Sequence, residues 1–195
     1  MPRQESPIEH APRITHGARI LFPGEGGAAL TKDDLAAYYT AMAPFLLPFL
    51  ARRPVSLVRC PEGIDGGCFY QKHRGGGFGP PVHAVTIREA DGTPDTYLWL
   101  DDAAGILACV QMNTIEFHGW GARIRMADDA GTPEPMPGGA DVEHPDRIVF
   151  DLDPDEGLGF DAVRDAARLL RDRLADIGLG SHAMLTGGKG IHVIV

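Results

Sequence analysis

The chain has few cysteines, no long apolar run and no excess of positive charge. Its 195 residues include three Cys, none in the C-x-x-C spacing of redox or zinc motifs. We therefore expect neither a disulfide framework nor a Cys-type zinc site, and a cytoplasmic, reducing location. No apolar stretch reaches the roughly 18 residues that cross a bilayer, and the first five residues lead into no signal peptide.

Charge is spread unevenly along the chain, whose formal net charge is −9. Residues 1–80 hold 9 Lys and Arg against 7 Asp and Glu, whereas residues 81–195 hold 9 against 20. An acidic total excludes a protein that coats nucleic acid by bulk charge. The acidic total charge is still compatible with a local basic face on the N-terminal half.

The composition is that of an ordered, loop-rich globular chain. Hydrophobic residues make up 44% and charged residues 23%, while 25 Gly and 16 Pro predict many turns. The length predicts one domain. We divide it into an N-terminal α/β part, residues 1–146, and a C-terminal part, residues 147–195.

The N-terminal part contains sequence signals for the start and the interruption of a helix. Thr31, with Asp34 three residues later, is typical of a capping box, so a helix begins there. We expect Pro44 and Pro48 to break or kink this helix. Its expected inward-facing residues are Leu35, Tyr38 and Met42.

Short runs of β-branched and aromatic residues predict strands. The expected strands are residues 19–22, 55–59, 68–72, 82–87 and 96–100. Asp101 is expected to cap a second helix that ends near Gln111. Residues 127–145, rich in Gly, Pro and acidic side chains, are expected to form a loop outside the core.

The C-terminal part has the clearest periodicity. Residues 148–152 alternate as a strand, residues 160–177 repeat apolar side chains at helical spacing, and residues 181–186 and 191–195 read as two further strands. Gly178 is expected to end the helix. Strand, helix, strand, strand is the first part of a ferredoxin-like β-α-β-β-α-β unit. Because the chain ends within a strand, we expect a fragment of a longer polypeptide.

Asp151 and Asp153 form the strongest chemical motif. Period two places both carboxylates on one face of the first strand of this unit. Two neighbouring carboxylates repel each other unless a cation neutralises them, and hard divalent ions take oxygen ligands of this kind. The motif predicts a divalent-metal site; the alternative is a solvated strand end before Pro154.

The segment Thr186-Gly187-Gly188-Lys189-Gly190-Ile191-His192 is the second motif. Glycines let a phosphate approach backbone N–H groups, and Lys189 adds positive charge. On a hairpin, Thr186 and His192 flank one ligand. It is not a Walker A loop, because a strand follows Lys189 in place of a helix. The alternative is an ordinary glycine-rich hairpin turn.

Two further groups precede these motifs. In the strand around residues 114–120, Ile115 and Phe117 are expected to face the core and Glu116 and His118 the other side, where His118 is either structural or catalytic. The second group joins aromatic with basic residues, which can stack bases and hold phosphates; its members are Phe69, Tyr70, Lys72 and His73. Neighbouring strand residues face opposite sides, so at least one of the two rings is expected in the core. Scattered surface charge is the alternative for the basic residues.

Five motifs in this order resemble one family. The resemblance, from about Ile14 to Val195, is to the polymerase domain of bacterial DNA ligase D, within the archaeo-eukaryotic primase superfamily. The segments that carry it are residues 53–61, 69–73, 113–120, 151–154 and 186–193. The implied fold is an α+β primase-polymerase fold with an incomplete ferredoxin-like unit at its C-terminal end.

The resemblance also implies roles for particular residues. The catalytic residues would be Asp151, Asp153 and His118, with the two aspartates as metal ligands. The nucleotide-binding residues would be Thr186, Lys189, His192, Lys72 and Arg59. The DNA-binding residues would be His16, Arg19 and Lys32 at a 5′-phosphate, and Phe69 and Tyr70 near the template and the incoming base. The family's third catalytic carboxylate lies beyond Val195.

The implied activity is template-directed nucleotidyl transfer with Mg²⁺ or Mn²⁺, in gap filling during double-strand break repair by end joining. The implied partners are 5′-phosphorylated DNA ends, template-primer, nucleoside triphosphates with ribonucleotides preferred, a fused or separate ligase, and the end-binding protein Ku. The implied location is the nucleoid-associated cytoplasm, with no membrane contact. Residues 1–195 alone are expected to be inactive. Two alternatives stay open: a non-catalytic DNA-end binding fragment, and a metal-dependent phosphoesterase or nuclease.

Overall fold

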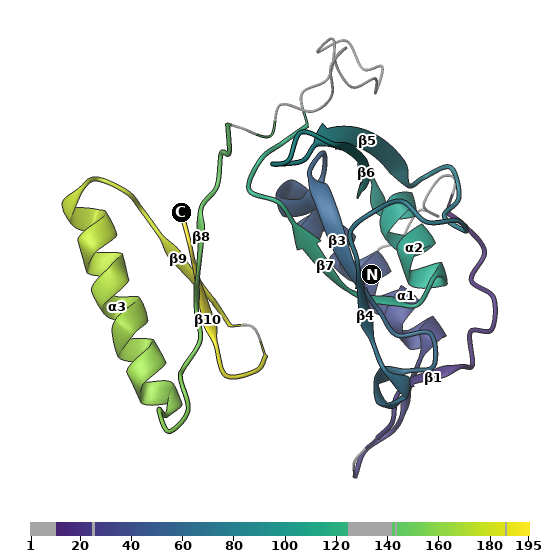
Figure 1. The fold of residues 1–195 in the computed structure, drawn as a ribbon. Coiled ribbons are helices and arrows are strands. Elements are labelled where there is room, and N and C mark those ends of the chain that lie inside the picture. The colour runs from purple at the N-terminus through teal and green to yellow at the C-terminus, as the bar shows by residue number, and fades with distance from the viewer. Residues whose placement is uncertain (1–10, 25, 125–141, 143, 186) are drawn as a thin grey trace, which may run out of the picture. The chain divides into compact units, whose positions relative to one another are not determined.

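The computed structural model describes residues 11–24, 26–124, 142, 144–185 and 187–195. The chain forms two compact units, Met1–Glu143 and His144–Val195 (Figure 1). Each unit has its own hydrophobic core. The mixture of helices and strands confirms the predicted α+β class. The predicted loop at 127–145 lies mostly outside the described residues.

The N-terminal unit is built around strand β3. In chain order its elements are β1 (Ile20–Phe22), β2 (Leu30–Thr31), α1 (Lys32–Leu50), β3 (Pro54–Arg59), the 3₁₀ turn η1 (Ile64–Gly66), β4 (Phe69–Gln71), β5 (His83–Arg88), β6 (Pro94–Trp99), α2 (Ala103–Gln111) and β7 (Thr114–Gly119). β3 pairs antiparallel with β4, β6 and β7, β5 pairs with β6, and β1 pairs with β2. Both helices pack against one face of the five-stranded sheet (Figure 1). The core between them and the sheet includes Val55 and Leu57 of β3.

Helix α1 begins as predicted but does not end as predicted. Thr31 and Asp34 form a complete capping box, with the Asp34 backbone N–H donating to Thr31 Oγ1. The carboxylate of Asp34 accepts hydrogen bonds from the Thr31 hydroxyl and backbone N–H, and these bonds lower its pKa. The expected break at Pro44 and Pro48 is wrong, because α1 runs through both to Leu50. Apolar side chains of the last turns, including buried Leu50, pack in the core, and this packing outweighs the lost backbone hydrogen bonds.

The inward face of α1 is turned by about one residue from the expected one. Leu35 is buried, but Tyr38 is 56% exposed and Met42 is 36% exposed. Their places in the core are taken by Tyr39 and Ala43. A small alanine allows close helix packing that a pattern of large residues does not reveal.

Helix α2 begins one residue later than expected. Its N-cap is Asp102, whose carboxylate accepts a hydrogen bond from the Gly105 N–H at 2.8 Å. The predicted cap, Asp101, instead lies 3.3 Å from Nε of Arg52. Two adjacent aspartates offer equivalent caps in sequence, so the ion pair to Arg52 decides which one caps the helix.

The C-terminal unit has the predicted strand-helix-strand-strand order. It consists of β8 (Val149–Leu152), α3 (Phe160–Asp176), β9 (His182–Leu185) and β10 (Ile191–Ile194). β10 lies between β8 and β9 and is antiparallel to both, so β8 and β9 run parallel, joined by α3. This is the split β-α-β arrangement of ferredoxin-like folds.

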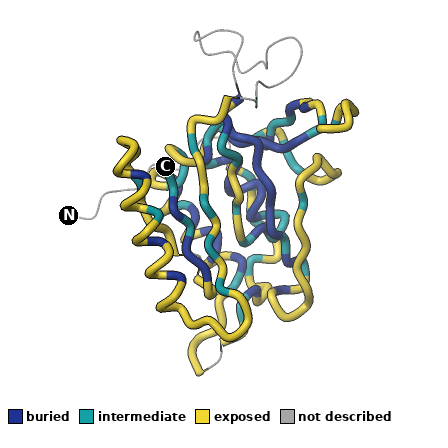
Figure 2. Tube along the Cα trace, turned by 60° about the vertical axis from the view of Figure 1, so that its left-hand side comes forward, coloured by how far each residue is buried: buried dark blue, intermediate teal, exposed yellow. Residues whose placement is uncertain are grey.

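Helix α3 packs one narrow stripe against this sheet. Val163, Ala167 and Leu174 are buried with Ile191 and Val193 of β10. Most of α3 is exposed, with buried positions recurring along it (Figure 2). The ends of the predicted stripe, Phe160 and Ile177, are exposed, since they extend past the short strands.

The end of α3 is the predicted one. Gly178 adopts a φ of 82°, in the left-handed region that favours glycine. Its N–H donates to Ala175 O at 2.9 Å, and the N–H of Leu179 donates to Leu174 O at 2.9 Å. These two bonds form a Schellman motif, which satisfies carbonyls at the helix end. Among the described residues, no helix is both long and apolar enough to cross a membrane.

Candidate active site

Strand β8 holds Asp151 on the face away from α3. Phe150 and Leu152 pack with the core beneath α3, so the side chain of Asp151, between them, points to the other face. Asp153 follows directly after the strand, and both aspartates are exposed. The first acidic motif therefore lies on the open face of the C-terminal sheet.

Strand β10 brings the second motif to the same place. His192 pairs with Asp151 in the β-ladder, and His192 Nε2 lies 3.2 Å from Asp151 Oδ1. Asp153 Oδ1 lies only 2.4 Å from the position that a Cβ would occupy at Gly190. Since Gly190 and His192 flank core-facing Ile191, they share the open face. The structure thus brings both carboxylates to the β9–β10 hairpin.

The turn of this hairpin presents a cation and glycine backbone. Lys189 is exposed in it, and Gly187 has a φ of 85°, which glycine adopts without strain. Thr186, predicted to face His192 across the ligand, lies outside the described residues. Glycine backbone, an ammonium group and an imidazole beside two carboxylates suit a metal-bound phosphate.

The donor chemistry of Asp151 and Asp153 fits a small hard cation. Mg²⁺ is commonly bound by one or two protein carboxylates, with water and substrate phosphates filling the other positions. Over the described part of the chain, no group of three or more His, Cys, Asp or Glu is arranged to hold a metal. The two aspartates can therefore supply part of a coordination shell, which a phosphate ligand would extend.

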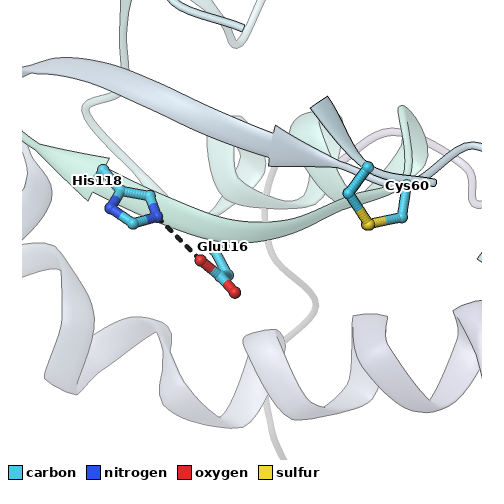
Figure 3. Close-up of a disulfide and its surroundings, with 4 residues drawn as sticks. Cys60, Glu116 and His118 are labelled. Atoms are coloured by element: carbon cyan, nitrogen blue, oxygen red, sulfur yellow. Dashed lines mark hydrogen bonds and ion pairs between the residues drawn. A yellow bond between two sulfur atoms is a disulfide. The ribbon is translucent and has the colours of Figure 1, made fainter. Parts of the chain in front are cut away.

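In the N-terminal unit, His118 has a carboxylate partner. His118 Nε2 lies 2.9 Å from Glu116 Oε2 on the same strand face (Figure 3). Tyr70 of β4 packs its ring 5.6 Å from the imidazole. As expected, Ile115 and Phe117 of β7 pack toward the core instead. The contact with Glu116 therefore orients the imidazole of His118. The two-residue spacing allowed this contact, but the sequence alone did not predict it.

A tyrosine of α1 supports this strand. The Tyr39 hydroxyl donates a hydrogen bond to Ile115 O at 2.7 Å, and its ring meets Phe117 edge-on at 5.1 Å. Burial raises the pKa of Tyr39, and the charges of Tyr38 and Glu116 add to this effect. The neutral hydroxyl is thus kept as a donor that fixes β7 to α1.

The aromatic pair on β4 is more exposed than expected. Phe69 is 46% exposed and Tyr70 is 66% exposed, so the expectation that at least one ring lies in the core is wrong. β4 has three residues at the edge of the sheet, and among the described strands it pairs with β3 alone. Neighbouring side chains of a strand face opposite sides, but one of them is buried only where other residues cover that side of the sheet. Within the described part of the chain, the β4 edge has no such cover. Both rings can therefore meet a ligand.

Arg59 lies beside this pair and is held by two aromatic rings and two hydrogen bonds. Its guanidinium lies 5.4 Å from the ring centre of Phe69 and 5.5 Å from that of Phe78. It donates hydrogen bonds to Met112 O at 2.9 Å and to Gln71 Oε1 at 2.6 Å. Burial lowers its pKa. Arg59 thus orders the β3–β4 edge, whereas Lys72, just past β4, is exposed.

The predicted 5′-phosphate residues lie around the start of α1. The Arg19 backbone N–H donates to His16 O at 2.9 Å, and the Lys32 N–H donates to Arg19 O at 2.8 Å. The Arg19 side chain donates to Pro61 O and lies 3.7 Å from a carboxylate oxygen of Glu62. The fold thus places His16, Arg19 and Lys32 next to one another, and their role at a 5′-phosphate stays a prediction.

Lys32 differs from its neighbours in being buried. Only 3% of Lys32 is exposed, and its Nζ donates to Gln111 O at 2.5 Å. Burial lowers its pKa, and the nearby charge of Arg19 lowers it further. Arg19 and His16 are exposed. Arg19 is therefore the exposed cation of this group, whereas the Lys32 ammonium is enclosed.

The cysteines correct the sequence interpretation. Cys60 and Cys68 form a disulfide between the end of β3 and the start of β4, whereas the sequence predicted no disulfide. A spacing of eight residues matches no short motif, and only the hairpin brings the two sulfur atoms together. Cys109 is free and buried, and burial raises its pKa.

Comparison with known proteins identifies one family. The family model "LigD, primase-polymerase domain" matches residues 31–195. The multifunctional non-homologous end joining DNA repair protein LigD of Mycobacterium tuberculosis is 34% identical over 188 residues, 96% of this chain and 23% of that protein. The LigD of Pseudomonas aeruginosa is 35% identical over 183 residues, 94% of this chain and 20% of that protein.

A solved structure shows the same fold. The polymerase domain from Mycobacterium tuberculosis ligase D in complex with DNA superposes with a TM-score of 0.79 at 31% identity, covering 95% of this chain and 61% of that chain. The present chain thus spans less than a quarter of the length of these two curated relatives. With the family model matched over most of its residues, the chain belongs to the LigD primase-polymerase domain family.

Proposed function

We propose that this chain is part of a metal-dependent, template-directed nucleotidyltransferase that fills gaps in end-joining repair. In this proposal it carries residues that bind the metal ion and the nucleotide. The contact of His192 Nε2 with Asp151 Oδ1 at 3.2 Å supports this most directly, with Asp153 beside Gly190 on the same face. Two carboxylates that face an imidazole and a glycine turn are the arrangement expected for binding a metal-bound triphosphate. A strand end with only a structural role needs no such arrangement.

Asp151 and Asp153 would hold Mg²⁺ or Mn²⁺. When bound, such an ion lowers the pKa of an attacking hydroxyl and neutralises charge on the leaving pyrophosphate. His192 donates from its ring to either Asp151 or a phosphate oxygen, so it would exchange one anionic partner for another on nucleotide binding. Lys189 adds a positive charge, and Thr186 would add a hydroxyl. Together these residues would orient the triphosphate for in-line attack.

The N-terminal unit would hold the DNA. Arg19, with His16 and the buried Lys32, would bind the 5′-phosphate of an end. The exposed Phe69 and Tyr70 rings would stack on bases near the template. Arg59 and Lys72 would add nucleotide contacts from this unit, and His118 would act as its catalytic residue. The proposed partners are ribonucleoside triphosphates, Ku and a ligase module, at the nucleoid.

Primer extension on gapped DNA with ribonucleotides and Mn²⁺ tests this function. In the whole polymerase domain, Asp151→Asn should lower the rate at least about a hundredfold, because an anionic contact to the reacting centre is lost. Asp155→Asn, the same change in an exposed residue past Pro154, is the matched control and should leave the rate unchanged. Equal rates for both variants would contradict the assignment.

Residues 1–195 alone should extend a primer weakly or not at all. The part of the chain that the structure describes holds only two clustered carboxylates on the open face, with no larger metal-ligating group. Pyrophosphate should be the product of the active domain; release of mononucleotides from DNA alone would indicate a phosphoesterase instead.

A further inference from the structure

The Cys60–Cys68 disulfide closes a loop that contacts the proposed end-binding arginine. Between the cysteines, Pro61 O accepts a hydrogen bond from the Arg19 guanidinium, and the Glu62 carboxylate lies 3.7 Å from it. Gly63 packs so closely on β1 that a Cβ there would lie 3.1 Å from Ile20 O. The position of this loop therefore fixes the position of Arg19.

The same disulfide borders the aromatic pair. Cys60 directly follows Arg59, and Cys68 directly precedes Phe69, whose ring lies under the Arg59 guanidinium. The N–H of Cys60 also donates to Asn113 O at 2.9 Å, next to β7. Figure 3 shows Cys60 at the end of β3, with Glu116 and His118 on the adjacent strand β7. One covalent bond thus joins the Arg19 contacts to the edge of β4.

The two cysteine residues differ in exposure. Cys60 is fully buried, whereas Cys68 is exposed, so a thiolate in solution can attack Cys68 Sγ. Cys109, buried and with a raised pKa, is not a competing nucleophile. A protein acting on chromosomal DNA works among thiol reductants, where disulfides are usually transient and redox-sensing.

We propose that Cys60–Cys68 is a reversible redox modification site whose oxidised form strengthens binding of 5′-phosphorylated DNA ends through Arg19. This rests on the proposed function for the role of Arg19. The reductant is a dithiol: one thiolate attacks Cys68 Sγ and releases the Cys60 thiolate, and the second thiol then displaces Cys68. The dithiol loses two electrons and two protons to become a disulfide, and the protein gains two thiols. Reduction frees the 61–67 loop, so Pro61 and Glu62 no longer fix the guanidinium.

The test first compares the oxidised and the dithiothreitol-reduced forms of the unchanged protein. Alkylation under denaturing conditions should label one cysteine before reduction and three after it. The dissociation constant for 5′-phosphorylated gapped DNA should rise roughly three- to tenfold on reduction, while that for 5′-hydroxyl DNA changes less. In Arg19→Gln, reduction should no longer change the affinity. Cys109→Ser is the control and should respond like the unchanged protein.

A second readout separates this inference from the proposed function. Amide hydrogen exchange at Gly63 and Gly66, whose N–H groups bond to Cys60 O at 3.0 Å and Gly63 O at 3.1 Å, should accelerate on reduction. If DNA binds equally in both redox states, or if Arg19→Gln responds as the unchanged protein does, the inference is wrong. If neither state binds DNA, the end-binding assignment of the proposed function fails and this inference fails with it, even if exchange in the loop still accelerates on reduction. Three free thiols in protein treated with oxidised glutathione would overturn the proposal altogether.

Discussion

Replacing Gly190 by alanine tests whether the position of Asp153 matters. A Cβ at this position would lie 2.4 Å from Asp153 Oδ1 and 3.2 Å from Leu152 O. Non-bonded carbon and oxygen atoms need more than about 3.0 Å, so the Asp153 carboxylate must move by up to about an ångström. The backbone at Gly190 lies outside the left-handed region, so alanine itself is not strained there.

The expected effects on stability and on metal binding differ. The free energy of unfolding should change by less than about 1 kcal/mol, because alanine also reduces the entropy of the unfolded chain. The affinity for Mn²⁺ should fall about tenfold or more, since an ångström of displacement takes a ligand oxygen out of coordination distance. The assay is Mn²⁺ titration followed by electron paramagnetic resonance of the free ion.

Gly180→Ala provides the matched control. It is the same chemical change in the same unit, and a Cβ there meets nothing within 4 Å. Its Mn²⁺ affinity should equal that of the unchanged chain. If Gly190→Ala also binds Mn²⁺ normally while its structure shows a displaced Asp153, then Asp153 is not a metal ligand.

Two further predictions concern the N-terminal unit. Arg53 is 1% exposed and donates to Trp120 O at 3.2 Å and Gly121 O at 2.7 Å, so Arg53→Met should lower the free energy of unfolding in urea by about 2 to 4 kcal/mol; an unchanged midpoint would show that these bonds add nothing. Burial, followed by the hydrogen bond to Glu89, raises the pKa of Tyr97 to about 12. The unfolded chain therefore loses this proton first, near pH 10, so stability should fall between pH 10 and 12. Tyr97→Phe should flatten that fall in alkaline urea titrations, and an unaltered slope would exclude this tyrosine as its source.

Local patterns predicted the C-terminal unit well. The alternation around Phe150 and Leu152, the stripe through Val163 and Ala167, and the stop at Gly178 are each set by residues near one another in sequence. The pairing of β10 with β8 followed from the ferredoxin-like order, and it brought the two acidic residues to the hairpin.

Predictions failed where tertiary packing decides. Pro44 and Pro48 stay within α1 because the helix remains packed on the core beyond them. The burial of Lys32 depends on Gln111, 79 residues away in sequence. The Cys60–Cys68 bond depends on the β3–β4 hairpin, which brings the two residues together. No spacing rule within one segment contains this information.

A crystal structure of the chain with Mn²⁺ and a ribonucleoside triphosphate tests the central claim most directly. We predict an anomalous manganese peak in contact with carboxylate oxygens of both Asp151 and Asp153, with the β- and γ-phosphates beside Lys189 and His192. Phosphates bound away from the β9–β10 hairpin, or a manganese peak that touches neither aspartate, would contradict the account.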